Sequence, residues 1–406
     1  MPDIPRVDDL KLRAGFGITG NQNSIPAFGY IALLDPTYRY SFGNVSVPAA
    51  VPQNFPNDYL RWEKVKQANA AMDVIMFGGR VNLTAEYYRR DTEDMLIQSP
   101  IPITSGFFDA ERPIINVGAI RNSGFEFALN TMMEKSGFRW VSDFNISFNE
   151  NEILRLSGPD GRDPIIGGEI TFNKFASRME VGRPIGAFFG HVTDGLFQNQ
   201  AEVLAHARQT VGTNPANSTS PGDIRFKDLN GDGVIDDNDR TYLGNPNPYF
   251  FYGWTNTISY GNFDLSVFIQ GVYGNQIFNA NKVFSEAMAT AQNQTVNTLN
   301  RWRGEGTSNS IPRATTTDPN NNQRVSDRYI EDGSFLRIKN VTLGYRLPDG
   351  LIRRLSLRQL RVYGSIQNMY TFTNYTGFDP EVGVSGIDNS VYPPSSIFTT
   401  GINIGF

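Results

Sequence analysis

The sequence contains no cysteine among its 406 residues, and histidine occurs at two positions, His191 and His206. The absence of cysteine excludes a disulfide framework, a thiolate metal site and a cysteine nucleophile. Neither histidine belongs to the H-E-x-x-H pattern of zinc hydrolases, and no G-x-S-x-G motif or phosphate-binding loop occurs. We therefore expect both histidines to have structural roles and the protein not to be an enzyme.

Long apolar runs and basic blocks are also missing. No window of about 18 apolar residues is present, which excludes a transmembrane helix. Strands remain able to cross a membrane, because about 9–11 residues with every second one apolar are sufficient. The net charge is −5 without a basic block, which argues against nucleic acid as a partner. The first residues show no export signal, so we expect that an exported protein would be missing its front in this chain.

What the chain has in quantity is glycine (39 residues) and aromatic side chains, with 29 Phe and 17 Tyr against 4 Trp. This composition, with few helix-favouring runs, predicts an all-β fold. Alternation of apolar and polar residues predicts about ten strands, at residues 10–19, 62–77, 80–88, 124–131, 138–149, 250–260, 263–273, 335–345, 360–368 and 398–406.

Two local features refine these strands. The pair Gly78-Gly79 marks a tight hairpin. In the strand at 335–345 the apolar residues shift from even to odd positions, which predicts a bulge near Lys339 and Asn340. Only one short helix is expected in the second half of the chain, around 281–290.

The connections between strands are alternately short and long. Residues 156–222 and 274–332 are long and irregular, whereas other links contain a few residues. The polar faces of the strands carry Asn, Gln, Thr, Asp, Glu and Arg, as the wet lumen of a membrane barrel does. Periodicity alone suits a soluble β-sandwich equally well. The asymmetry of the connections and the aromatic end of the last strand favour an antiparallel transmembrane β-barrel segment.

An acidic stretch past the middle of the chain has the spacing of a calcium-binding loop. Its oxygen-bearing side chains occupy loop positions 1, 3, 5, 9 and 12, Val234 at position 7 would offer its carbonyl, and Gly233 allows the sharp turn at position 6. The predicted metal ligands are Asp228, Asn230, Asp232, Val234, Asp236 and Asp239. The alternative is a metal-free turn rich in Asp and Asn.

Several stretches, in the same order along nearly the whole chain, resemble the SusC/RagA family of TonB-linked outer-membrane transporters of Bacteroidetes. They are RWEK at 61–64, EYYRRDTEDML at 86–96, NVGAIRNSGFE at 116–126, VGRPIG at 181–186, TDGLF at 193–197, PGDIRFKDLNGDG at 221–233, LGNPNP at 243–248, IEDGSFLRIKNVTLGY at 330–345 and FDPE at 378–381.

The resemblance implies that residues 1–406 are the C-terminal part of a plugged barrel of about 22 strands, in the outer membrane of a Gram-negative cell. About ten strands cannot close such a barrel, so we expect a curved, open sheet. The family implies uptake of oligosaccharides or peptides, a SusD-like surface lipoprotein as partner, and energy from the TonB complex through a region absent from this chain. Residues 157–248 would form a long extracellular loop region, and the acidic loop, at 228–239, would act there as a structural calcium clamp.

Two further interpretations remain open at this point. The aromatic cluster at 247–254 is expected to form the lipid-interface girdle of the barrel rather than a sugar platform. Trp302, flanked by Arg301 and Arg303, is a candidate contact for a ligand or for the lipoprotein.

Two alternative functions also remain open. One is a secreted β-rich glycan-binding module or enzyme with a dockerin-like calcium loop, and the other is a surface receptor without transport.

Overall fold

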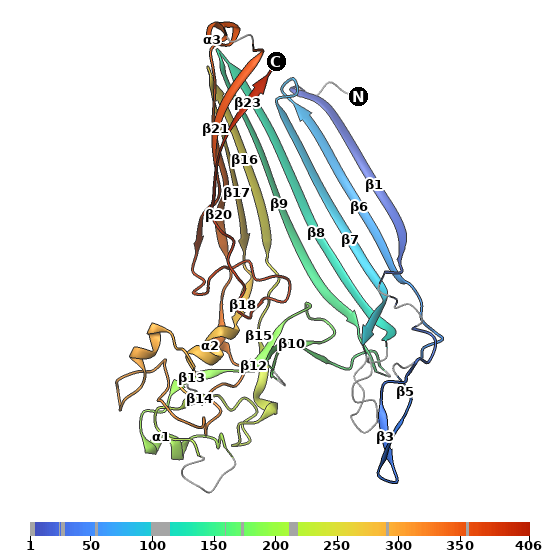
Figure 1. The fold of residues 1–406 in the computed structure, drawn as a ribbon, viewed down its shortest axis with the longest axis vertical. Helices are drawn as coiled ribbons and strands as arrows, with labels where there is room; N and C mark the ends of the chain where they lie inside the picture. The colour runs from blue at the N-terminus through green and yellow to red at the C-terminus, as the bar shows by residue number, and fades with distance from the viewer. Residues whose placement is uncertain are drawn as a thin grey trace.

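A ten-stranded antiparallel sheet forms the tall wall of the molecule (Figure 1). The computed structural model describes residues 5–23, 25, 29–52, 56–98, 114–158, 160–171, 174–210, 218–289, 292–354 and 357–406. In spatial order, the strands are β1 (Val7–Asn21), β6 (Glu63–Met76), β7 (Val81–Gln98), β8 (Ile114–Lys135), β9 (Phe138–Arg155), β16 (Phe250–Tyr260), β17 (Phe263–Tyr273), β20 (Phe335–Arg346), β21 (Gln359–Thr373) and β23 (Ile397–Gly405). The two outer strands, β1 and β23, do not pair with each other, so the sheet is open as predicted.

The turns at one end of the wall are short, and we call this the turn end. Gly78 and Gly79 both have positive φ in the β6–β7 turn, and their amides donate to the Asp8 carboxylate at 2.6 and 3.0 Å. The β8–β9 and β16–β17 turns are equally tight, while α3 (Asp349–Arg354) lies between β20 and β21. Both chain termini lie at this end (Figure 1).

The bulge predicted in β20 is confirmed. Phe268 of β17 pairs with Asn340 and Ile269 pairs with Ile338, so Lys339 is the extra residue. One inserted residue reverses the parity of a strand. The insertion therefore keeps Ile338 and Val341 on the same face, although they are three positions apart.

The two faces of the wall differ in chemistry. On the outer face, large apolar side chains are exposed along every part of the sheet, including Phe16 (74%), Phe125 (51%), Leu343 (54%) and Ile402 (62%). The inner face carries hydrogen-bonded polar groups, such as Arg13 Nε–Asp73 Oδ2 at 2.7 Å and Arg361 Nε–Asp264 Oδ1 at 2.9 Å. An apolar patch of this extent is not left against water in a soluble protein, so the outer face suits lipid.

The height of the outer apolar face can be read from β16. Near the end with the long loops, the loop end, a row of aromatic residues crosses five strands; it contains Tyr87, Phe125, Phe148, Phe250 and Tyr273. The ring centroids are 5.0 Å apart for Tyr87 and Phe125, 5.5 Å for Phe148 and Phe250, and 5.1 Å for Phe250 and Tyr273. At the turn end, Tyr260 and Phe263 are exposed. The 11 residues of β16, at about 3.4 Å each and a tilt of about 40°, span about 25 Å, the height of the apolar band in outer-membrane barrels.

Strands β7 and β8 continue beyond the aromatic row, and this extension was not predicted. Both strands were expected to stop or start near the row, at Tyr88 and Gly124. Beyond it, charged residues replace apolar ones on the outer face, with Arg121 Nε bonded to Asp91 Oδ1 at 2.8 Å. Where both faces are wet, alternation no longer marks a strand, although backbone pairing continues.

The long connections fold into smaller units at the loop end (Figure 1), so the expectation of irregular chain at 156–222 was wrong. One sheet contains β10 (Ile165–Thr171), β11 (Lys174–Met179), β12 (Phe188–His191) and β15 (Arg240–Gly244). Others pair β13 (Thr193–Leu196) with β14 (Ile224–Phe226), and β18 (Gln276–Asn279) with β19 (Ile330–Asp332) and β22 (Ile387–Asp388). The remaining short elements are β2 (Leu34–Asp35), β3 (Arg39–Phe42), β4 (Val45–Pro48), β5 (Val51–Pro52), α1 (Gln200–Ala205), α2 (Ala280–Ser285), η3 (Asp237–Asp239), η4 (Val296–Asn300) and η5 (Asp327–Tyr329).

Helices contribute little. The helix expected at 281–290 is present as the shorter α2, and within the described parts of the chain no helix has the length and apolarity to span a membrane.

We predict that a charge at the middle of the outer face destabilises the wall far more than the same charge on the inner face. Val267→Arg is expected to lower the free energy of unfolding by about 2–4 kcal/mol, because Val267 lies midway between the two aromatic ends of β17 and faces lipid. Ser266→Arg, one residue away on the inner face, is the matched control. Urea unfolding in liposomes measures both, and equal losses would contradict the assignment of the faces.

Candidate functional site

The connections at the loop end share a common hydrophobic core, and we call residues 156–249, 274–334 and 374–396 the loop assembly. Phe188, Phe278, Val283 and Tyr329 are at most 1% exposed and pack together with Ile387. These residues come from all three connections. The loop assembly is therefore one packed body at the loop end of the wall.

The acidic loop is anchored in a second core within this body. Ile235, at loop position 8, is 4% exposed and packs with Leu196, Ile224 and Phe226. Its amide donates to the Arg208 carbonyl at 2.9 Å, next to a bridge between Arg208 and Val234. The acidic loop is therefore packed onto a hydrophobic core of the loop assembly.

The carboxylates of the loop accept backbone amides. Asp239 is fully buried and accepts from Leu229 N (2.8 Å) and Asp236 N (2.9 Å), which caps η3. Burial opposes ionisation of Asp239, but these amide donors hold the pKa of its carboxyl below the usual range. Asp228 accepts from Gly231 N (2.7 Å) and Gly233 N (2.9 Å).

The other predicted ligands are satisfied in the same way. Asp232 accepts from Val234 N (2.9 Å) and from the amide of Asn230 (3.0 Å), and Asp236 accepts from Asn238 N (2.7 Å). Within the described residues, no group of three acidic or histidine side chains is placed to hold a metal ion. The six residues thus form a hydrogen-bonded turn, and calcium binding there stays a prediction.

A buried network beside the loop was missed in the sequence. Asp223 is 0% exposed and receives two bonds from Arg313, at 2.9 and 3.1 Å, and one from Asn322. Asn320 and Gln209 extend the network to the Ile224 carbonyl. A fully paired buried carboxylate fixes the geometry of its surroundings. Through Asp223, the PGDI part of the motif at 221–233 thereby joins the connection 156–249 to the connection 274–334.

A second buried ion pair attaches the assembly to the wall. Arg337 of β20 is 1% exposed on the inner face and bonds Asp379 Oδ2 at 2.5 Å, Glu381 Oε2 at 2.9 Å and Thr371 Oγ1 at 2.8 Å. This contact unites the motifs at 330–345 and 378–381. Both motifs were visible in the sequence, but their distance along the chain concealed that they form one site.

The histidines have structural surroundings. His191 ends β12, is 6% exposed and lies against Phe226, with ring centroids 5.6 Å apart. Burial, with Arg324 and Arg240 nearby, lowers the pKa of His191 to about 4, so it is neutral at pH 7. His206 follows α1, and its ring meets the edge of Phe197 at 5.2 Å.

Trp302 is partly buried and has a packing role, and its contact with a ligand or with the lipoprotein stays a prediction. It packs against the core around Leu196, and its indole N–H donates to Gln198 Oε1 at 3.3 Å. A Cβ on Gly222 would lie 2.4 Å from the Trp302 ring, so glycine is required for this contact. Arg303 is exposed.

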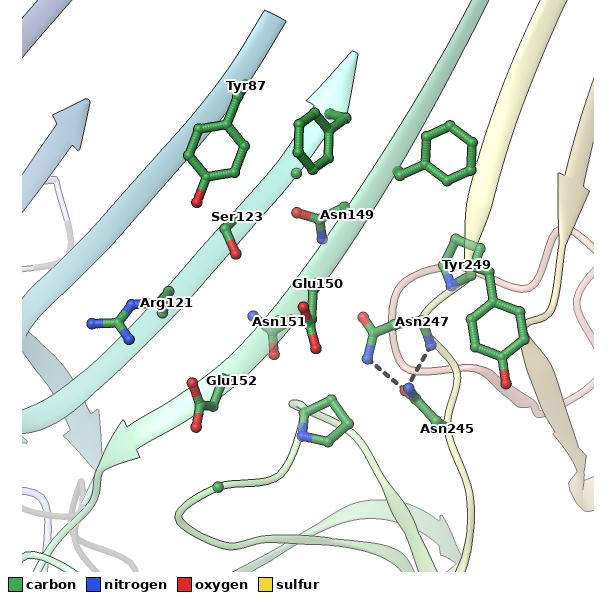
Figure 2. A pocket seen from close by; sticks show the side chains of 16 residues that line it. Tyr87, Arg121, Ser123, Asn149, Glu150, Asn151, Glu152, Asn245, Asn247 and Tyr249 are labelled. Carbon is green, nitrogen blue, oxygen red and sulfur yellow. Dashed lines mark hydrogen bonds between the residues drawn. The ribbon is translucent and has the colours of Figure 1, made fainter. Parts of the chain in front are cut away.

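A cavity of about 730 Å³ opens where β16 begins. Phe148 of β9 pairs with Phe250, and beyond this pair the chain at 245–249 diverges from β9 (Figure 2). Aromatic rings from the outer row line the cavity at one end, and amide and carboxylate groups line it at the other, including Asn149, Asn151, Glu150, Glu152, Asn245 and Asn247. Such a lining suits hydrogen bonding to hydroxyl or amide groups beside an apolar surface.

The aromatic cluster at 247–254 divides between these surroundings. Phe250, Tyr252 and Trp254 share the outer face, where Phe250 belongs to the aromatic row. Tyr249 is 69% exposed and lines the cavity. The cluster thus contributes Phe250, Tyr252 and Trp254 to the outer face. It contributes Asn247 and Tyr249 to the cavity.

A paired antiparallel wall with one apolar and one polar face, and folded loops at one end, defines the class of outer-membrane β-barrel proteins. The family described as TonB dependent receptor-like, beta-barrel, matches residues 7–369, and the chain belongs to this family. TonB-dependent receptors of the SusC/RagA type are outer-membrane proteins, so the predicted family and location are confirmed.

Similar proteins of known family and solved structures support this assignment. TonB-dependent receptor P3 of Formosa agariphila is 33% identical over 100% of this chain and 40% of its own length. TonB-dependent receptor SusC of Bacteroides thetaiotaomicron is 30% identical over 100% of this chain and 38% of its own length. The structure of the RagAB peptide transporter matches 100% of this chain and 42% of that chain, with a TM-score of 0.80 and 23% identity. The chain thus spans about 40% of the length of the relatives it matches.

Removing Arg337 is expected to release the segment around Asp379 from the wall. Arg337→Met leaves a buried carboxylate without its partner, which costs about 3–5 kcal/mol. Hydrogen exchange of the amides at 379–388 measures the loss. Glu381→Gln is the matched control with a smaller expected effect, since Glu381 is 49% exposed. Unchanged exchange in Arg337→Met would show that the ion pair does not hold this segment.

The calcium prediction is tested by isothermal titration of the protein with calcium. We expect binding to the wild type at millimolar calcium, and we expect Asp228→Ala with Asp232→Ala to abolish it and disorder the loop. Asp237→Ala removes the same type of charge at a position that is not a predicted ligand and is 93% exposed, so it serves as control. Absence of calcium binding to the wild type would leave the metal-free turn as the correct interpretation.

Proposed function

We propose that the chain is part of the barrel wall of a TonB-dependent importer that takes up nutrients across the outer membrane. The observation that carries this proposal is the wall itself, whose outer face is apolar over the height of a membrane and whose inner face is polar. Membership of the TonB-dependent receptor family supports the same function. In this proposal the loop assembly lies on the extracellular side, and the turn end faces the periplasm.

The nutrient proposed is an oligosaccharide or a peptide, delivered with a SusD-like surface lipoprotein and imported with energy from the TonB complex. Similarity to SusC supports this type of receptor, and similarity in fold to the RagAB peptide transporter supports the peptide alternative. The four asparagines of the 730 Å³ cavity suit hydrogen bonding to either substrate. A structural calcium ion in the acidic loop remains part of this proposal.

The alternative of a secreted glycan-binding module or enzyme fits the structure less well. A secreted module would expose its outer face to water, and the exposed aromatic and aliphatic residues of β1, β8 and β23 make that unfavourable. The family comprises transporters rather than enzymes.

Uptake by whole cells tests the proposal. Deletion of the gene is expected to abolish growth on one class of nutrient, oligosaccharide or peptide mixtures supplied as the sole carbon source. Restoration of the gene is expected to restore growth only in cells with a functional TonB system. Growth of the deletion strain equal to that of the wild type on every mixture would contradict import, and binding of the nutrient at the surface without uptake would indicate a receptor instead.

A further inference from the structure

A second cavity, of about 430 Å³, lies inside the loop assembly and is lined by three basic side chains. Lys174 begins β11, Arg240 begins β15, and Arg324 belongs to the segment that runs beside β12, where His191 N donates to the Val325 carbonyl at 2.9 Å. We call this cavity, with Lys174, His191, Arg240 and Arg324, the cationic pocket. Two of the three connections, 156–249 and 274–334, bring its charges together.

The three cations of the pocket are poorly neutralised. Within the described part of the chain, the acceptors of Lys174 Nζ are neutral oxygens of Gln323, at 3.3 and 3.4 Å, and Arg324 Nη2 donates to the Gln209 carbonyl at 2.6 Å. Among the described residues, their one ion pair within 4.0 Å joins Arg240 Nη1 to Asp237 Oδ1 at 3.8 Å, and the Asp237 side chain is 93% exposed. A carboxylate that far into solvent screens a buried cation weakly.

Two arginines outside the pocket, one in the loop assembly and one in β20, have close acidic partners. Arg313 and Arg337 meet buried carboxylates at 2.9 and 2.5 Å. In the cationic pocket, burial lowers the pKa of Lys174 and Arg324, which expresses the cost of cations without close partners. The Asp318 carboxylate acts on Lys174 and Arg324 from beyond ion-pair distance, so the cavity can still accept a negative charge close to these cations.

Two buried nitrogens in the pocket also lack partners. Arg324 Nη1 and His191 Nδ1 are inaccessible to water and have no hydrogen-bond partner among the residues that the structure describes. Asp236, which also lines the cavity, has its carboxylate engaged by the backbone and side-chain amides of Asn238, at 2.7 and 3.3 Å. Buried donors without acceptors are uncommon in folded proteins and call for a specific explanation.

We propose that the cationic pocket binds an oxyanion, a carboxylate or a sulfate, carried by a group about the size of one sugar or one amino acid. The volume is at the lower end of the range for small-molecule sites. Guanidinium and ammonium groups form short, strong hydrogen bonds with such anions. A bound oxyanion would neutralise Lys174 and Arg240 and give Arg324 an acceptor after a small side-chain adjustment. The proposal concerns binding alone and does not depend on transport.

Titration of the purified protein with sodium sulfate and with sodium acetate tests this site. The experiment is performed in detergent with a chelator present, so that calcium near Asp236 does not contribute. We expect saturable binding of one anion per protein, and the preferred arm shows whether sulfate or carboxylate is the better ligand. Lys174→Gln and Arg240→Gln are each expected to weaken binding about tenfold, because each removes one charged donor.

Lys227→Gln is the matched control, since Lys227 is an exposed lysine of the same body that does not line the cavity. Thermal unfolding of each variant identifies loss of fold, and two independent variants keep the test valid if one of them fails to fold. An anomalous selenate peak between Lys174, Arg240 and Arg324 in crystals would support the site. The proposal is overturned if neither anion binds saturably at tens of millimolar, or if both pocket variants bind as well as the wild type.

Discussion

The structure depends on the inability of hydrocarbon to form hydrogen bonds. Every backbone N–H and C=O at membrane depth needs a partner within the protein, which strands obtain only by pairing side by side. The same constraint acts on side chains of the outer face. Trp140 Nε1 donates to Asn256 Oδ1 at 3.0 Å, and Trp254 Nε1 donates to Ser142 Oγ at 2.9 Å. Each indole thus satisfies a polar group that would otherwise face lipid alone.

Beyond the aromatic row, the protein is surrounded by water rather than lipid, and its stability there depends on a hydrophobic core. The wall has little core of its own, because one face suits lipid and the other is polar. The loop assembly therefore builds its own core around Phe188, Phe278 and Tyr329 and fixes itself to the wall through Arg337. Buried ion pairs are weak sources of net stability but strong determinants of geometry once formed. Asp223 and Arg337 have that role, at the centre of the assembly and at its junction with the wall.

The sequence predicted those parts of the fold in which local pattern and environment agree. Strands β16 and β17 were predicted to the residue, since each lies between two aromatic ends with lipid on one face. The bulge at Lys339 was visible as a change of parity. The extensions of β7 and β8 were not, because charged residues on both faces erase the period of two. The folded loop assembly was missed for a similar reason: its strands are two to seven residues long, and several pair with partners distant in the chain.

In the acidic loop, the spacing of the residues predicts calcium ligands, whereas the structure shows the same carboxylates accepting backbone amides. Its residues match a calcium loop in order, yet Asp239 is buried as a helix cap and Asp228 is occupied by two glycine amides. The spacing of the residues shows which oxygens could reach a common cation. The fold determines which of these oxygens already accept hydrogen bonds. The turn is held by these bonds and by the packing of Ile235, and calcium binding there stays a prediction. That shape connects β14 to β15, and it thereby sets Asp236 and Arg240 at the mouth of the cationic pocket. A cation in the loop and an anion in the pocket would neutralise opposite charges on the two sides of one turn, so each would strengthen the field that attracts the other.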